Sequence, residues 1–67
     1  MDTRSWYEIR IVNFSSGNEI GVVNQPVPPN IGDKVNLHFR PGNVARVISR
    51  TFDYSKGLYV TIEVAYI

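Results

Sequence analysis

Few side chains in this sequence could carry out catalysis. His38 is the only histidine, and there is no cysteine. A Cys-His nucleophile and a multi-histidine metal site are therefore excluded by composition. His38 and Arg46 could together do acid-base chemistry on a phosphodiester, but an exposed strand histidine beside a surface arginine explains the same two residues.

Carboxylates, serines and glycines add no further catalytic or ligand site. Asp33 and Asp53 stand alone in separate stretches, without the dense spacing of a calcium-binding loop, and each is better explained as a turn cap. No serine lies in a nucleophile motif. The glycines are scattered singly and cannot form a phosphate cradle. The sequence thus predicts a protein that is not an enzyme and has no catalytic residues, metal or cofactor, and it implies no small-molecule substrate.

Basic side chains interleaved with aromatic ones are the clearest functional signal. The candidate partner-binding residues are Arg46, Arg50, Phe52, Tyr54 and Tyr59. Tyrosine and arginine dominate the hot spots of protein interfaces, and the same mixture lets a small barrel stack bases and hold phosphates. A purely structural role also fits, because tyrosine favours strands and an outer sheet face needs charge. The strands that carry these residues decide whether they share one surface.

Alternation of apolar and more polar side chains predicts strands over most of the chain. Residues 58–67 place Leu58, Val60, Ile62, Val64 and Tyr66 on one face, which is the period of a half-buried strand. Residues 6–14 and 19–24 predict two further strands, joined by a hairpin turn at 15–18. Residues 25–30 contain three prolines and predict a stiff extended crossover.

Between the crossover and the last strand, the sequence predicts two strands and three turns. A tight turn at 31–34 leads into a strand at 35–40, and Pro and Gly at 41–42 predict the next turn. The fourth strand, 44–54, alternates less cleanly. Lys56 and Gly57 then predict a two-residue hairpin loop, with Gly57 at positive φ.

This turn assignment predicts a register for the last two hairpins. Thr51 would pair with Ile62, Ser49 with Val64, Arg50 with Glu63, Phe39 with Ala45 and Leu37 with Val47. The predicted core is Ile9, Ile11, Ile20, Val22, Val35, Leu37, Phe39, Val47, Val60, Ile62 and Val64. Ile48, Phe52, Tyr54 and Tyr59 would then lie outside, together with Lys34, His38, Arg46 and Arg50. A β-bulge in the fourth strand would turn some of them inward.

These elements predict one all-β domain over residues 1–67. We expect a small five-stranded SH3-like barrel or a strongly curled antiparallel sheet, with an OB-like barrel and an open meander as alternatives. A chain of this length buries roughly 60% of the surface that its unfolded form exposes, so its core is small. Oligomerisation is one way to reinforce it.

Charge and hydropathy narrow the choice of partner. Seven Lys and Arg against six Asp and Glu leave a net charge of +1, too balanced to favour strong binding to nucleic acid. No apolar run approaches the roughly 20 residues of a membrane span, and residues 1–6 lack the apolar stretch of a signal peptide. We expect a cytoplasmic, non-catalytic protein-interaction module.

Such a module would act as an accessory or inhibitory protein, of the size common in bacteria and phages. Its exposed aromatic and basic sheet face would bind a protein partner or a second copy of the chain. A nucleic-acid-binding small barrel is the alternative function.

Overall fold

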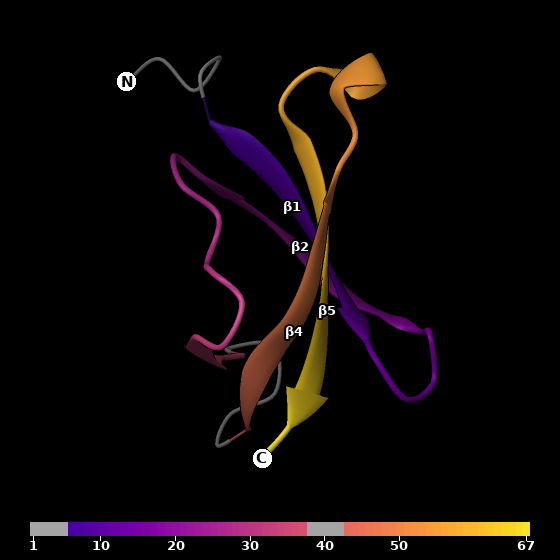
Figure 1. The fold of residues 1–67 in the computed structure, drawn as a ribbon, viewed down its shortest axis with the longest axis vertical. Coiled ribbons are helices and arrows are strands. Elements are labelled where there is room, and N and C mark those ends of the chain that lie inside the picture. Colours follow the sequence, from indigo (N-terminus) through magenta and orange to yellow (C-terminus); the bar gives the residue numbers. More distant parts are fainter. Residues whose placement is uncertain (1–5, 38–42) are drawn as a thin grey trace.

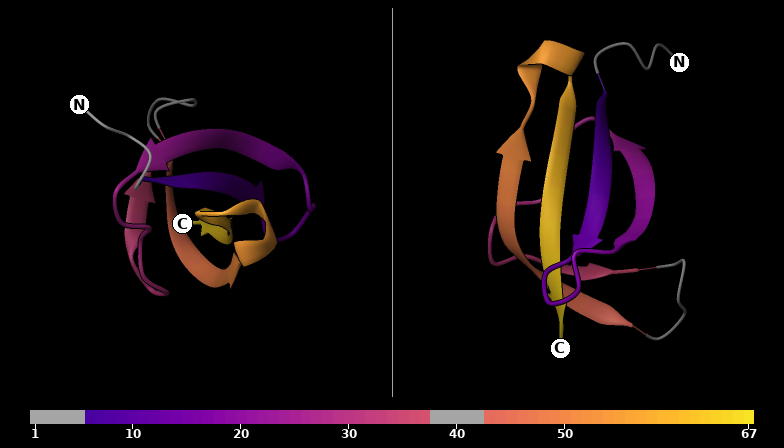
Figure 2. Two further views of the ribbon diagram at one scale, coloured as in Figure 1. Left: turned by 90° about the horizontal axis from the view of Figure 1, so that it is seen from above. Right: turned by 90° about the vertical axis from the view of Figure 1, so that its right-hand side faces the viewer.

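The computed structural model describes residues 6–37 and 43–67. It contains one five-stranded sheet (Figure 1), in which the strands follow the spatial order β2-β1-β5-β4-β3. The elements are β1 (Tyr7–Asn13), β2 (Glu19–Gln25), β3 (Lys34–Asn36), β4 (Val44–Phe52), the short 3₁₀ helix η1 (Tyr54–Lys56) and β5 (Tyr59–Tyr66). The sheet curls through 214° into a half-barrel, as Figure 2 shows from above. The predicted small, curled all-β fold is therefore confirmed.

The sheet consists of two antiparallel hairpins joined side by side through a parallel pair of strands. β1 pairs with β2 and β4 pairs with β5, both antiparallel. The inner strands β1 and β5 run parallel, with Ile9 opposite Val60 and Ile11 opposite Ile62. β3 adds a short antiparallel edge to β4. Residues 26–33 then lead from one edge of the half-barrel to the other, across its open side (Figure 2).

The core lies on the concave face of the sheet. Its buried members are Ile9, Ile11, Leu37, Ala45, Val47, Val60, Ile62 and Val64. Seven of the predicted core residues are among them, and Ile20 and Val35 are half-buried against the same cluster. Phe39, the predicted partner of Ala45, lies outside the described residues.

Val22 is a wrong core prediction, and a bulge explains the error. Ile11 pairs with Gly21 and Val12 pairs with Glu19, so Ile20 is an extra residue in β2. Beyond this bulge the two faces of the strand exchange places. Val23 lies opposite the buried Ile9 and is half-buried, whereas Val22 is exposed.

The predicted register of the last hairpin is also wrong, because β4 contains a bulge, which the sequence indicated only as an alternative. Val47 pairs with Val64 and Ser49 pairs with Glu63, so Ile48 has no partner in β5. Arg50 therefore lies opposite Ile62 instead of Glu63. Every residue of β4 beyond Ile48 thus occupies the face opposite to the predicted one.

The pairing of β3 with β4 is displaced along the strands but keeps its faces. Val35 lies opposite Ala45, whereas the predicted pairing of Leu37 with Val47 would have placed Val35 opposite Ser49. Because the shift is an even number of residues, Val35 and Ala45 still point to the concave side. Just before β3, Asn30 donates its backbone N–H to the Asp33 carboxylate at 2.8 Å, so Asp33 caps a turn as predicted.

The last turn is longer than the predicted two-residue loop. Gly57 has the predicted positive φ, at 87°. However, η1 precedes it, and Asp53 caps η1 by accepting a hydrogen bond from the backbone N–H of Ser55 at 3.1 Å. This longer turn and the bulge at Ile48 together set the observed register of β4.

Candidate interaction surface

Three of the five predicted partner-binding residues, together with Tyr7, form a side-chain cluster at one end of the half-barrel. The rings of Phe52 and Tyr54 are stacked, with centroids 6.0 Å apart and an interplanar angle of 6°. The guanidinium carbon of Arg50 lies 5.2 Å from the centroid of the Phe52 ring. Tyr7 of β1 meets the same ring edge-on, at 5.8 Å and 64°. We call these four residues the Phe52 cluster.

The bulge at Ile48 is what brings the Phe52 cluster together. It places Arg50 and Phe52 on the concave side of β4, opposite Ile62 and Val60. Phe52 is half-buried and packs against the core, while Tyr54 is 70% exposed. The cluster therefore has a half-buried base and an exposed aromatic tip.

Arg50 also attaches the proline crossover to the sheet. Its Nη1 atom donates a hydrogen bond to the backbone carbonyl of Pro29 at 3.4 Å. The guanidinium thus contacts both the Phe52 ring and the loop that crosses the open side of the half-barrel. Its orientation is set by the fold, and it remains partly accessible.

Arg46 and Tyr59 do not join the Phe52 cluster. Arg46 lies between Ala45 and Val47, which are buried on the concave face, so its exposed side chain lies on the convex face. Tyr59 precedes the buried Val60 and also lies on the convex face. Arg46 pairs with Ala65, six residues along β5 from Tyr59, so the two lie roughly 20 Å apart. The five predicted residues therefore divide between two faces.

Tyr59 is surrounded by charged side chains on the convex face. The Lys56 ammonium nitrogen lies 4.9 Å from the centroid of its ring. Arg10 and Glu63 line the same open hollow as Tyr59. The hydrogen bond from Arg10 Nε to the Glu19 carboxylate, 2.6 Å long, raises the pKa of Arg10, and the negative charge of Glu19 adds to the effect. This surface is polar, and Arg10 on it is paired with a carboxylate.

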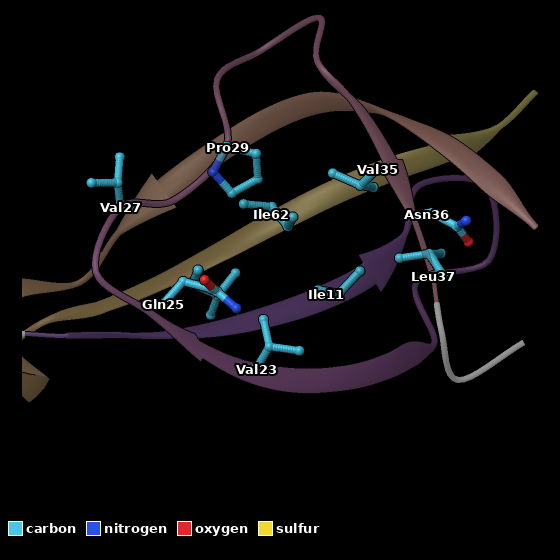
Figure 3. Close-up of a pocket in the computed structure, with 10 residues that line it drawn as sticks. Ile11, Val23, Gln25, Val27, Pro29, Val35, Asn36, Leu37 and Ile62 are labelled. Atoms are coloured by element: carbon cyan, nitrogen blue, oxygen red, sulfur yellow. The ribbon is translucent and has the colours of Figure 1, made fainter. Parts of the chain in front are cut away.

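An apolar groove follows the concave face beneath the proline crossover. It has a volume of about 420 Å³ and opens between the sheet and residues 26–33. Figure 3 shows Val23 of β2, Pro29 of the crossover and Ile62 of β5 around it, whereas the Val27 side chain extends outward from the crossover. Its described lining consists mostly of hydrocarbon side chains, together with the neutral amides of Gln25 and Asn36.

The turn that carries Tyr54 is held by a small polar network. The Ser55 hydroxyl donates to the Asp53 carboxylate at 2.5 Å, and the Ser55 backbone N–H donates to the same oxygen. The side-chain hydrogen bond from Ser55 is the main cause of the lowered pKa of Asp53, and the positive charge of Lys56 contributes less. The ionised form of Asp53 thus fixes the exposed tip of the cluster.

Sequence reasoning missed two contributors to this region. Tyr7 shares the alternating face of Ile9 and Ile11, a signal that was visible, but its contact with Phe52 depends on the parallel pairing of β1 with β5. Pro29 was assigned to the crossover without a contact to the sheet. Its carbonyl reaches Arg50 because of the bulge at Ile48.

Within residues 6–37 and 43–67, no group of three or more His, Cys, Asp and Glu side chains could hold a metal ion. In the same residues, no helix has the length and apolar character needed to cross a membrane. No known protein family, curated protein or solved structure shows a significant match to this chain. Its chemistry must therefore be inferred from its own side chains.

Proposed function

We propose that the protein is a non-catalytic interaction module that binds a protein partner through the Phe52 cluster. The observation that supports this is Tyr54, a residue that is 70% exposed although its ring is stacked on the Phe52 ring, which packs against the core. An aromatic side chain that is already ordered loses little conformational entropy on binding, so more of its contact energy is available for affinity. The neighbouring Arg50 supplies hydrogen-bond donors beside an apolar surface, which is the composition of a hot spot.

Photo-crosslinking tests this proposal at the level of one residue. Tyr54 is replaced by p-benzoylphenylalanine in cells that naturally produce the protein, and crosslinked products are identified by mass spectrometry. The matched control carries the same replacement at Tyr66, an aromatic residue 39% exposed near the other end of β5. We expect a protein adduct specific to position 54. Excess wild-type protein, which lacks the crosslinking residue, should suppress this adduct, and excess Tyr54→Ala protein should not. Identical adducts at both positions would contradict the proposal.

Nucleic-acid binding is the second candidate, favoured by the parallel stacking of Phe52 and Tyr54. Such rings provide a platform for bases. Against it, the net charge is +1, and Arg10 and Arg50 already contact a carboxylate and a backbone carbonyl. Fluorescence anisotropy with labelled single-stranded and duplex oligonucleotides, at low and moderate salt, separates the two functions. Binding that the Tyr54→Ala change abolishes would favour nucleic acid.

A further inference from the structure

The two outer strands of the sheet differ sharply as exposed edges. β3 has three residues and begins with Lys34, and shortness and lysine are two ways in which natural sheets prevent edge-to-edge pairing. β2 has seven residues and a single charged side chain, Glu19. That charge is neutralised within the subunit by Arg10, whose Nε lies 2.6 Å from the Glu19 carboxylate. β2 therefore has neither the shortness nor the lysine of β3, and its one irregularity is the bulge at Ile20, near its beginning.

The outer edge of β2 carries backbone groups that no strand of the described residues pairs with. Among residues 6–37 and 43–67, β1 is the one strand that neighbours β2 in the sheet. The N–H of Glu8 donates to the carbonyl of Leu58 on the β5 side, so the next residue, Ile9, directs its backbone groups toward β2. Ile9 lies opposite Val23. The backbone groups of Val22 and Asn24, the two neighbours of Val23, consequently point away from β1.

The side chains of β2 also fit a symmetric pairing. Val22 is 45% exposed, a large apolar side chain in the middle of the edge strand. In an antiparallel pair centred on Val22, this residue would face its own equivalent, and Gly21 would face Val23. Glu19 would face Gln25 instead of another carboxylate. The only charge of the strand thus avoids its own copy, and β-branched side chains meet at the centre.

We propose that β2 pairs antiparallel with β2 of a second copy of the chain, so that two half-barrels share one continuous sheet. The pairing is isologous and therefore closes as a dimer with two-fold symmetry. It would satisfy the outward backbone groups of Val22 and Asn24 and cover the Val22 side chain. A domain with a core this small gains the most from such reinforcement. The surface is distinct from the Phe52 cluster, and the proposal stands independently of the proposed function.

Amide exchange measured by NMR at several protein concentrations tests the pairing directly. We expect exchange of the Val22 and Asn24 amides to slow as concentration rises, because pairing protects them. The Val23 amide, which faces β1, serves as an internal control and should exchange slowly at every concentration. Sedimentation velocity on the same samples should show a monomer that converts to a dimer. A monomer throughout, from micromolar to millimolar, would overturn the proposal, as would a dimer in which Val22 and Asn24 stay unprotected.

Edge variants test which surface the copies use. Val22→Lys places like charges opposite each other and should raise the dimer dissociation constant by about tenfold or more. Asn24→Pro removes an edge donor that the subunit itself does not use and should have the same effect. Val22→Thr keeps the β-branched shape and should preserve the dimer. Ile48→Lys, the same kind of change at an exposed apolar residue of β4, is the matched control. Dimers that persist unchanged in both edge variants would overturn the proposal.

The outcome of these experiments does not depend on the outcome of those on the Phe52 cluster. Tyr54→Ala should leave the dimer intact, and Val22→Lys should leave crosslinking from position 54 intact. Circular dichroism on each variant shows whether it is folded before its oligomeric state is measured. A Val22→Lys protein that is folded and still dimeric counts against the proposed edge.

Discussion

Phe52 of β4 lies directly opposite Val60 of β5, in the part of the hairpin beyond the bulge. Val60 is fully buried, and Phe52 packs against the same core. The Phe52 ring also contacts Tyr54, Arg50 and Tyr7. Phe52 is therefore the residue through which the exposed cluster is anchored to the interior.

Truncation of Phe52 should cost stability as well as binding. We expect Phe52→Ala to lower the free energy of unfolding by about 1–3 kcal/mol, less than the loss for a fully buried phenylalanine, because this ring is only half-buried. Tyr54→Ala, at the exposed tip, should change it by about 0.5 kcal/mol or less. Urea denaturation followed by circular dichroism measures both. Equal effects would show that the Phe52 ring does not contribute to the core.

Ile62 should be among the most costly residues to truncate. It is 1% exposed and lies at the centre of the sheet, between Ile11 of β1 and Arg50 of β4. We expect Ile62→Ala to lower the free energy of unfolding by about 2–5 kcal/mol, a large share of what a small domain has. Thr61→Ala, one position earlier on the other face, is the matched control. A melting curve that Ile62→Ala leaves unchanged would contradict the assignment of the concave core.

Gly57 should be required for its backbone conformation alone. Its φ is 87°, and a Cβ atom built there would meet no atom within 4 Å, so a side chain would be strained without a steric clash. We expect Gly57→Ala to cost about 1–3 kcal/mol, and Gly57→Val to slow or prevent folding. Lys56→Ala, in the same turn without positive φ, should have little effect. Thermal denaturation of the three variants shows whether stability is lost through backbone strain at position 57 or through any substitution in this turn.

Acid should weaken the turn that carries Tyr54. Folding lowers the pKa of Asp53, chiefly through the Ser55 hydroxyl hydrogen bond, so the ionised form stabilises the folded state. This contribution is present above the unfolded-state pKa of about 4 and is lost as pH falls through the lower folded-state value. Asp53→Asn should therefore be less stable than wild type at neutral pH, and the difference should shrink below about pH 4. Urea denaturation of both proteins across this range measures it. A difference that is independent of pH would refute the assigned cause.

Deletion of Ile48 should be tolerated, because it would leave a regular ladder. Val47 pairs with Val64 and Ser49 with Glu63, so removing the unpaired residue makes consecutive residues face consecutive partners. Arg50 and Phe52 would keep the concave face. Thr51 lies in the regular part of the strand, so its deletion should move either Phe52 or the residues before position 51 to the opposite face of the sheet. We expect this change to unfold the protein. Circular dichroism and one-dimensional NMR of the two deletion variants distinguish these outcomes.

Alternation was sufficient to predict the strands and most of the core. Val60, Ile62 and Val64 belong to a strand that is apolar on one face throughout, so its buried side is unambiguous. The two wrong face assignments, in β2 and in β4, occur where one residue of the strand has no partner in the neighbouring strand. The broken alternation of 44–54 was compatible with a bulge but did not give its position, and nothing in 19–24 led to the prediction of one at Ile20; each bulge reverses the face of the residues that follow.

The candidate surface was predictable in composition but not in arrangement. Arg50, Phe52 and Tyr54 meet because of the bulge at Ile48, and the same change of register separates them from Tyr59. The pairing of β1 with β5 could not be predicted either, because no turn connects these strands and both offer similar apolar rows. Without it, the contact between Tyr7 and Phe52 could not be foreseen.

The parallel contact of β1 with β5 has a consequence for the order of assembly. Each hairpin can close through its own short loop, but Ile9 and Val60 meet only when about fifty residues of chain have been looped out. The docking of the two hairpins should therefore limit the folding rate, as expected for a topology dominated by distant contacts. Until then, the apolar row of β1 and the β2 edge are both uncovered. The unassembled hairpin of β1 and β2 is consequently the species most exposed to aggregation.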